Sequence, residues 1–472
     1  MESQSAAVPL ISEMPVPEKT GAGTVPGRLA KEVWEESKKL WEIAGPAVFM
    51  RLVLYSMTVI SQAFAGHLGD RELAAFSIAV TVINGLNFGF FLGMASALET
   101  LCGQAYGARQ YSKLGVYMQR SWLVLLAVAV LLAPTYVFSE QLLLALGQPA
   151  ELSRDAGRAG VYMLPVHFVL AVLLPLNRFL QCQRKNWVTA VTTAAAFPVH
   201  AAATWLLVQR FQLGVLGAAT ALNLSWALIL VLQLVYALGG GCPETWTGFS
   251  AAAFVDLTEF IKLSMASGVM LCLENWYYRI LIFLTGYLKN AEVAVDALSI
   301  CLSLHAWELM IHLGFLVGAG VRVANELGAA NGAGARSATI VSTVTSFLIS
   351  LIISLLVLMF HDKFALIFSS SEAVINAVDH ISIWGNGVAI GSGWQGLVAY
   401  VNIGSYYLIG VPIGLVLGWT FHYGVLGIWI GMIGGTAVQT IILACITLQC
   451  DWDEEARKAR NRMRRWGGSD SD

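Results

Sequence analysis

Charged residues are scarce in this sequence: Asp, Glu, Lys and Arg make up 12% of its 472 residues, whereas hydrophobic residues make up 57%. A typical soluble domain carries about 25% charged residues, and the mean hydropathy here is +0.67. With a net charge of −2, the chain also lacks the basic excess typical of nucleic-acid binding. The composition therefore predicts an integral membrane protein that has no nucleic acid as a partner.

Sequence signatures of enzymes are absent as well. There is no paired-histidine motif, no Ser/His/Asp signature and no phosphate-binding glycine loop after a strand. The seven cysteines lie mostly in apolar segments, which indicates reduced packing thiols rather than a disulfide framework. Their spacing matches no metal site. We therefore expect no enzyme activity, no cofactor and no bound metal.

Hydrophobic stretches long enough to cross a bilayer recur along the chain, because a transmembrane helix needs about 20 apolar residues. Six lie near residues 43 to 65, 74 to 98, 117 to 138, 158 to 180, 187 to 208 and 214 to 238. After the polar break GGGCPETWTGFSAAAFVD, five more lie near 258 to 285, 293 to 319, 337 to 360, 397 to 420 and 424 to 448. The pattern predicts an all-α, polytopic membrane protein.

The two sets of stretches resemble each other, which indicates an internal duplication. Three pairs of motifs match: GHLGDRELAAFSI from Gly66 with GYLKNAEVAVDALSI from Gly286, QAYGAR from Gln104 with NELGAA from Asn325, and GVLGAATA from Gly214 with GVLGIWIG from Gly424. The first two pairs are about 220 residues apart, but the third only about 210. We infer that the second half has lost roughly ten residues or more between Ala330 and Tyr423, where a sixth span is missing.

Basic residues give an independent prediction of topology through the positive-inside rule. They cluster before the first span and after spans two, four and eight: Arg28, Lys31, Lys38, Lys39, Arg109, Lys113, Arg120, Arg184, Lys185, Arg322 and Arg336. The tail RKARNRMRRW follows the last span. Both chain ends are therefore expected inside, which requires an even number of crossings. Residues 372 to 393, which include WGNGVAIGSG, read as a short or re-entrant segment rather than a lipid-facing helix.

Several long motifs identify a family resemblance. They are GPAVFMRLVLYSMTVISQAFAGHLGDRELAAFSI, FLGMASALETLCGQAYGARQYSKLGVYMQRSW, LNRFLQCQRKNWV, MLCLENWYYRILIFLTGYLKNAEVAVDALSIC, GVRVANELGAANGAGAR and GSGWQGLVAYVNIGSYYLIGVPIG. In this order they closely resemble the plant branch of the multidrug and toxic compound extrusion (MATE) family, the DETOXIFICATION proteins. The resemblance covers nearly all of the chain from Lys38 to Asp451.

The resemblance implies two pseudo-symmetric lobes of six transmembrane helices around a central cavity. It also implies exchange of an organic solute for protons or sodium. In that family the tenth span directly precedes a GVAxGSGWQ motif, whereas here IWGNG leads straight into it. The tenth helix is therefore expected to be truncated or missing. The alternative is a re-entrant element at this place.

These observations divide the chain into five parts. We expect a disordered cytosolic tail at 1–37, a first lobe at 38–240 and an inter-lobe loop at 241–257. A second lobe at 258–450, with span 10 incomplete, and a basic cytosolic tail at 451–472 follow.

Two acidic residues inside spans are the main functional candidates, because a carboxylate in the bilayer is costly. Glu274 lies in the seventh span and matches a family motif whose Glu takes part in cation coupling and substrate binding. Burial favours the protonated carboxyl, so such a group can bind and release a proton. A structural carboxylate bonded to Tyr278 is the alternative. Glu308, in the eighth span, is a second coupling candidate, with a structural role as its alternative.

Uncharged polar and aromatic residues in the spans are secondary candidates. Residues expected to line the cavity, or else to make helix or lipid contacts, are Gln62, Asn84, Asn87, Trp276, Tyr277 and Tyr278. Residues expected to act in gating or packing are His312, Gly103, Gln104 and Gly107. His312 stands where plant relatives generally have a proline, which changes the kink expected in that helix.

The function expected from this resemblance is secondary active antiport. The protein would export organic solutes, either xenobiotics or plant secondary metabolites such as flavonoid conjugates or alkaloids, in exchange for protons. The first span lacks the Asp of the sodium-coupled bacterial pattern, which favours protons. We expect a monomer in the lipid bilayer of the vacuolar or plasma membrane. A passive anion channel or flippase-like protein, and an inactive variant lacking one helix, are the alternatives.

Overall fold

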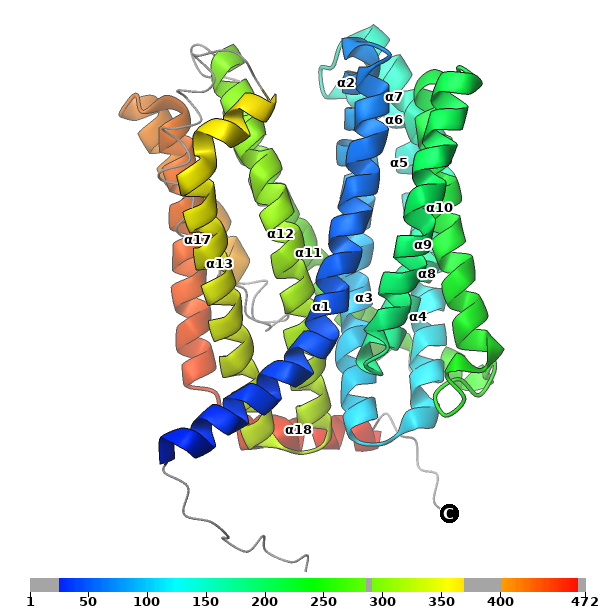
Figure 1. Cartoon of the computed structure of the whole chain (residues 1–472), viewed down its shortest axis with the longest axis vertical. Helices are drawn as coiled ribbons and strands as arrows, with labels where there is room; N and C mark the ends of the chain where they lie inside the picture. The colour runs from blue at the N-terminus through cyan, green and yellow to red at the C-terminus, as the bar shows by residue number, and fades with distance from the viewer. Residues whose placement is uncertain (1–24, 256, 286–290, 369–400, 466–472) are drawn as a thin grey trace, which may run out of the picture.

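The computed structural model describes residues 25–255, 257–285, 291–368 and 401–465, and these residues form helices and connecting turns without a strand. Two groups of long, roughly parallel helices lie side by side (Figure 1). Nine helices in the described part are long and apolar enough to cross a membrane. The predicted all-α, polytopic membrane fold is confirmed.

The first lobe contains the helices up to residue 241. They are α1 (Val25–Gly66), α2 (Asp70–Ile78), η1 (Ala79–Asn84), α3 (Gly85–Gly107), α4 (Tyr111–Leu132), α5 (Pro134–Val137), α6 (Ser139–Ala145), α7 (Ala150–Tyr162), α8 (Leu164–Cys182), α9 (Asn186–Trp205), η2 (Leu206–Arg210), α10 (Gly214–Tyr236) and η3 (Ala237–Gly241). A short helix, η4 (Ala251–Phe254), lies in the predicted inter-lobe loop. Helix α1 begins at Val25, so residues 25–37, placed in a disordered tail by the sequence, are helical.

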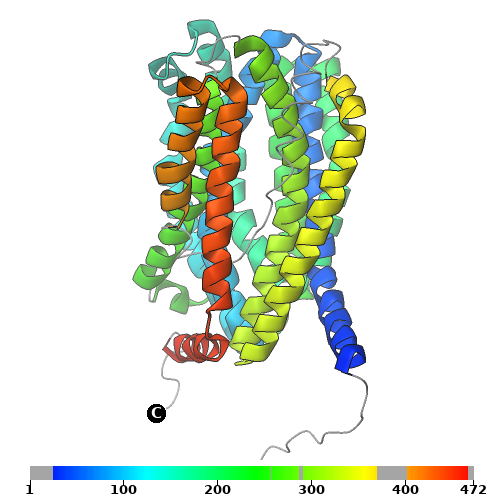
Figure 2. The same ribbon diagram turned by 90° about the vertical axis from the view of Figure 1, so that its left-hand side faces the viewer.

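The second lobe contains α11 (Leu257–Thr285), α12 (Ala291–Gly328), α13 (Gly332–Phe368), η5 (Ile403–Gly410), α16 (Val411–Leu415), η6 (Val416–Thr420) and α17 (Gly424–Leu448). Helix α18 (Trp452–Arg465) lies in the predicted basic tail and crosses the end of the bundle at a steep angle to the spans (Figures 1 and 2). The predicted junction at Trp384 to Gly387 falls within residues 369–400 and lies outside the described residues.

The internal repeat inferred from the sequence recurs in backbone detail. The π-helix η2 is followed by a turn in which Gln212 and Gly214 have φ of 53° and 58°. The π-helix η6 is followed by the same turn, in which His422 and Gly424 have φ of 58° and 56°. A positive φ is unfavourable for most residues, so its recurrence at matching places supports a duplicated unit.

Contacts between the two lobes follow the same repeat. A Cβ on Gly107 would lie 2.8 Å from the carbonyl carbon of Asn325, and one on Gly328 would lie 2.7 Å from that of Gln104. The motifs QAYG and NELG therefore pack against each other reciprocally. Reciprocal contact between matching residues is what two-fold related surfaces make.

A second reciprocal set lies deeper in the bundle. Gly93 of α3 packs against the backbone of Gly268 in α11, and Gly314 of α12 packs against Val48 in α1. Glycines at these crossings let the helix backbones approach closely. Helices α1 and α3 of the first lobe thus meet α12 and α11 of the second around a pseudo-two-fold axis.

The largest buried apolar core lies mainly in the first lobe. It includes Phe76, Phe91, Tyr117, Tyr136 and Phe179, each at most 1% exposed. Many apolar side chains on outer faces stay exposed, such as Ile340, Val344 and Leu348 of α13, which are about half exposed. Exposed apolar faces of this size are expected where helices meet lipid rather than water.

One end of the molecule collects the basic turns, and we call it the basic end. It holds the start of α1, the α3–α4 turn with Arg109, the α8–α9 turn with Arg184, the α12–α13 turn and α18 (Figure 1). Val33 of α1 and Trp452 of α18 line the same pocket there. The two described chain ends therefore lie at one end, as the charge pattern predicts.

The directions of the last helices agree with this arrangement. Helix α17 runs antiparallel to residues 403–420, because Gly414 lies against Gly431 and Gly418 against Gly427. It ends at the basic end, where α13 begins. Helix α13 and residues 403–420 therefore run in the same direction, away from the basic end.

Candidate transport site at the lobe interface

A buried polar cluster in the second lobe surrounds the helix that carries Glu274. Tyr277 of α11 is fully buried and stacks on Tyr406, with ring centroids 4.2 Å apart. Its hydroxyl group donates to the carbonyl oxygens of Gly431 and Met432 at 3.3 and 3.2 Å. The hydroxyl of Tyr407 donates to the carbonyl of Leu273 at 2.7 Å. These bonds fix α11 against the helices that follow residue 403.

The cluster continues through an amide pair. The hydroxyl of Tyr406 donates to Oε1 of Gln439 at 2.6 Å, and Nε2 of that glutamine donates to Oδ1 of Asn402 at 2.6 Å. All three side chains are buried. A chain of buried hydrogen bonds of this kind holds its members in one arrangement, because an unpaired polar group would be costly in an apolar surrounding.

The predicted coupling residues lie on the inter-lobe helices. Glu274 is in α11 and Glu308 is in α12; their side chains, and that of Tyr278, lie outside the described residues. Of the neighbouring aromatic residues, Trp276 is 47% exposed, whereas Tyr277 is buried. Their cavity-lining role stays a prediction.

Candidate residues of the first lobe contact neighbouring helices. Asn84 accepts a hydrogen bond from the hydroxyl of Tyr136 at 3.0 Å, and Asn87 donates to the hydroxyl of Thr135 at 3.0 Å. Both contacts join the α2–α3 segment to α5, which agrees with the helix-contact interpretation. Gln62 is half-buried on α1.

The predicted gating residues divide between two places. Gly103, Gln104 and Gly107 lie at the contact between α3 and α12, where Gly103 packs against Ala324. His312 lies elsewhere: its Nε2 contacts the hydroxyl of Ser350 in α13, within the second lobe. The structure thus brings three of the four together where the lobes meet, and the gating role itself stays a prediction.

A buried ion pair between the lobes was not among the predicted residues. The guanidinium of Arg322 in α12 donates from Nε and Nη2 to the two carboxylate oxygens of Glu36 in α1, at 2.8 and 3.0 Å. It also bonds Glu326 at 2.6 Å. The Arg322 and Glu36 side chains are 7% and 9% exposed. The sequence showed Arg322 only as one basic residue of a turn and placed Glu36 in a tail, and no periodic pattern links two residues so far apart.

A second buried ion pair lies against the same interface. Arg178 of α8 contacts Glu99 of α3 at 2.6 Å, and their side chains are 8% and 9% exposed. Gly320 of α12 packs directly against the Glu99 carboxylate. Paired charges near the basic end therefore border the contact between α3 and α12.

The described residues contain no group of three or more His, Cys, Asp or Glu side chains that could hold a metal ion. Two pseudo-symmetric helical lobes, joined by reciprocal glycine contacts and by the buried Glu36–Arg322 pair, define a multi-pass membrane transporter built from two parallel repeats. The comparisons with known proteins specify the family.

The family model described as MatE matches residues 46–206 and 266–416. The two matches begin 220 residues apart and end 210 apart, which reproduces the offsets of the internal repeat. The chain belongs to the MATE family. It is therefore a membrane efflux transporter for small organic solutes, and not an enzyme.

Similar full-length relatives are plant proteins. Protein DETOXIFICATION 27 of Arabidopsis thaliana is 53% identical over 482 residues, which cover 99% of this chain and 98% of the relative. Protein DETOXIFICATION 26 of the same plant is 51% identical over 487 residues, with both chains fully covered. Because 487 aligned positions exceed the 472 residues of this chain, the relative has residues at positions where this chain has none.

Solved structures of the family share the fold. The crystal structure of the eukaryotic MATE transporter AtDTX14 matches with a TM-score of 0.85 and 33% identity, over 91% of this chain and 99% of that one. An outward-facing multidrug resistance MATE transporter of the MOP superfamily matches with a TM-score of 0.74 at 17% identity, over 91% of this chain and 96% of that one. The second likeness concerns the fold alone.

Proposed function

We propose that this transporter exports organic solutes in exchange for protons, and that Glu274 binds the proton. The observation that carries the proposal is the position of α11, which is packed between the lobes. On one side its Gly268 contacts α3, and further along its Tyr277 contacts α17. A proton bound on this helix can therefore affect both lobes.

Helix periodicity supports Glu274 as the residue concerned. Positions 270, 274 and 277 share one face of a helix, because they are spaced by four and three residues. On that face Met270 packs against Leu443 of α17, and Tyr277 stacks on Tyr406. Position 274 therefore lies on the face by which α11 contacts α17 and η5, and a carboxylate can bind and release a proton.

Competition at one site would produce the exchange. When a proton and a solute cannot both occupy the site, release of one permits binding of the other. Glu308 on α12, the second lobe's other inter-lobe helix, is proposed as a further coupling residue. The relatives' name, DETOXIFICATION, supports xenobiotics as solutes; plant secondary metabolites are proposed as well, with the vacuolar or plasma membrane as the location.

The closed contact at the basic end fits alternating access. A transporter with a central site exposes it to one side at a time. For a site between the lobes to reach the basic end, α3 must separate from α12, and Glu36 from Arg322. The Glu36–Arg322 ion pair and the glycine contacts are thus the contacts that inward opening would break.

The test measures proton-driven uptake of a fluorescent organic cation into vesicles that contain either the wild-type protein or a variant. We expect Glu274→Gln to abolish uptake driven by a pH gradient, because glutamine cannot exchange a proton, while the protein stays in the membrane. Glu259→Gln is the matched control, since Glu259 is an exposed acid on the same helix. Undiminished uptake by Glu274→Gln would refute the coupling role. Uptake that persists after the gradient is collapsed would instead favour the passive channel or flippase-like alternative.

A further inference from the structure

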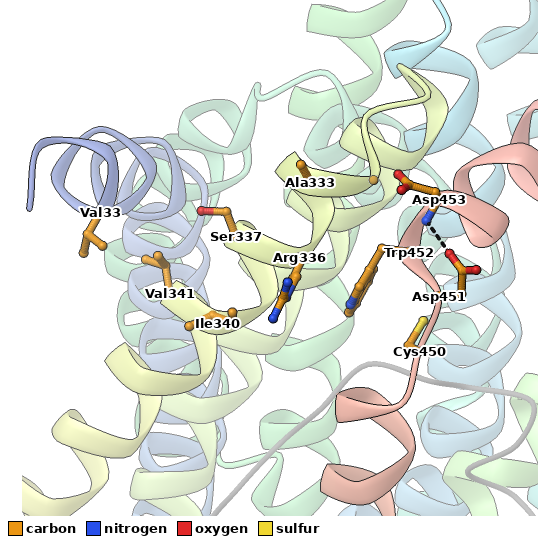
Figure 3. Close-up of a pocket in the computed structure, with 11 residues that line it drawn as sticks. Val33, Ala333, Arg336, Ser337, Ile340, Val341, Cys450, Asp451, Trp452 and Asp453 are labelled. Atoms are coloured by element: carbon orange, nitrogen blue, oxygen red, sulfur yellow. Dashed lines mark hydrogen bonds between the residues drawn. The ribbon is translucent and has the colours of Figure 1, made fainter. Parts of the chain in front are cut away.

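A pocket at the basic end lies apart from the proposed transport site. It has a volume of about 510 Å³ and is bordered by α1, the first turns of α13 and the start of α18 (Figure 3). Val33, Ile340 and Val341 supply apolar walls, and Arg336, Trp452 and Asp453 supply the polar and aromatic rim. The pocket falls within the range of volumes of small-molecule sites, about 300 to 1,000 Å³.

Two opposite charges at the rim have no ion-pair partner among the described residues. One is the guanidinium of Arg336 on α13, which is exposed, and the other is the carboxylate of Asp453. Figure 3 shows Arg336 beside Trp452, with Asp453 on the other side of the indole. The neighbouring Asp451 already has hydrogen-bond partners, because its Oδ1 accepts hydrogen bonds from the backbone N–H groups of Asp453 and Glu454 at 3.1 Å each.

The pocket opens onto a surface suited to hydrocarbon. Ile340, Val344 and Leu348 recur every four residues along α13 and are 52%, 51% and 50% exposed. Residues at this spacing form one stripe along the helix. The stripe begins in the pocket and runs away from the basic end, toward the middle of the span.

We propose that this pocket binds the headgroup of a zwitterionic phospholipid. The phosphate pairs with Arg336, because guanidinium binds phosphate with charge-assisted hydrogen bonds. The ammonium group lies toward Trp452 and Asp453, since an indole face and a carboxylate both attract a cation. One acyl chain follows the stripe from Ile340. A purely anionic headgroup fits less well, because Asp451 and Asp453 also line the pocket.

The occupant would contact both lobes. Val33 belongs to α1, one turn before Glu36, whereas Arg336 and Trp452 belong to the second lobe and the helix after it. A lipid in this position is adjacent to the Glu36–Arg322 pair and favours the closed basic end. This expectation does not depend on proton coupling or on the identity of the solute.

The test is native mass spectrometry of the purified full chain with added phosphatidylethanolamine or phosphatidylglycerol. We expect one phosphatidylethanolamine molecule to be retained, and its affinity to fall about tenfold or more in Arg336→Gln. Asp453→Asn should weaken the binding of phosphatidylethanolamine but not that of phosphatidylglycerol. Ser337→Trp, which fills the pocket, should release the lipid although the charges remain. The matched control is Arg457→Gln, which removes an exposed arginine of α18 outside the pocket.

Two outcomes would overturn the proposal. Equal retention of phosphatidylethanolamine by the wild type, Arg336→Gln and Ser337→Trp would show that the lipid binds elsewhere. Tighter retention of phosphatidylglycerol, sensitive to Arg336→Gln but not weakened by Asp453→Asn, would identify an anionic lipid instead. Because two of the variants alter only the exposed rim, loss of folding in Ser337→Trp would still leave the test decided by the other two.

Discussion

At the scale of single residues, the Glu36–Arg322 pair is a buried ion pair that joins the two lobes. Both side chains are buried, and the guanidinium makes a two-point contact with the carboxylate. Removing Arg322 leaves the buried Glu36 carboxylate with only the more exposed Lys39, at 3.4 Å, and loss of one partner of a buried pair costs about 3–5 kcal/mol. The pair therefore stabilises the closed basic end in particular.

We expect Arg322→Gln to open the basic end. The measurement is the rate at which Val321→Cys, at a residue that is buried here, reacts with a maleimide reagent. The rate should rise in Arg322→Gln and fall back when Glu36→Gln is added, because no buried charge then remains unpaired between α1 and α12.

The control for this experiment is an exposed pair within the first lobe. Arg184 contacts Glu42, and their side chains are 38% and 52% exposed. Exposed pairs contribute about 0–1 kcal/mol, so Arg184→Gln should leave the labelling rate unchanged. A rise of the same size in both variants would mean that Arg322 has no specific effect on opening.

At the scale of helices, the contact between α3 and α12 depends on glycine. Gly107 has no room for a side chain, because its Cβ would lie within 2.9 Å of both the carbonyl carbon of Asn325 and the amide nitrogen of Ala329. Gly434 of α17 is also helical, but nothing lies within 4 Å of a Cβ built there. The two positions differ in packing rather than in backbone conformation.

We expect Gly107→Leu to separate α3 from α12 and to lower the melting temperature of the purified protein. Overpacking costs about 1–3 kcal/mol, and here the displaced atoms are backbone. Gly434→Leu should melt close to the wild type. If Gly107→Leu melts like Gly434→Leu, the close contact between QAYG and NELG does not stabilise this state.

The sequence predicted the helices better than the contacts between side chains. Apolar runs and basic turns predicted the spans and the duplication, because membrane helices carry their own length and charge signals. The sequence matched QAYGAR and NELGAA as repeats, but it did not predict that Gly107 contacts Asn325. It did not predict the bonds of Tyr277 or Arg322 either, because these bonds join segments far apart in the chain, and helix phase alone does not specify partners.

At the scale of the whole molecule, the two lobes are unequal in length but similar in arrangement. The α3–α4 and α12–α13 turns match at an offset of 221 residues, since Arg109 and Ala330 both have positive φ. The later turns, at Gly214 and Gly424, match at 210. The shortfall therefore falls between these turns in the second lobe, while α17 and α18 still return the chain to the basic end. Such an arrangement leaves the inter-lobe helices α1, α3, α11 and α12 in place.

Solute export driven by protons through those inter-lobe helices is the function that we propose for this chain. It is tested most directly by reconstituting the purified protein in sealed vesicles and following accumulation of an organic cation while a pH gradient is imposed. We expect the solute to accumulate above its external concentration, with protons moving in the opposite direction, and to leak away when the gradient is collapsed. Equilibration without accumulation, at the same rate with and without the gradient, would contradict the account.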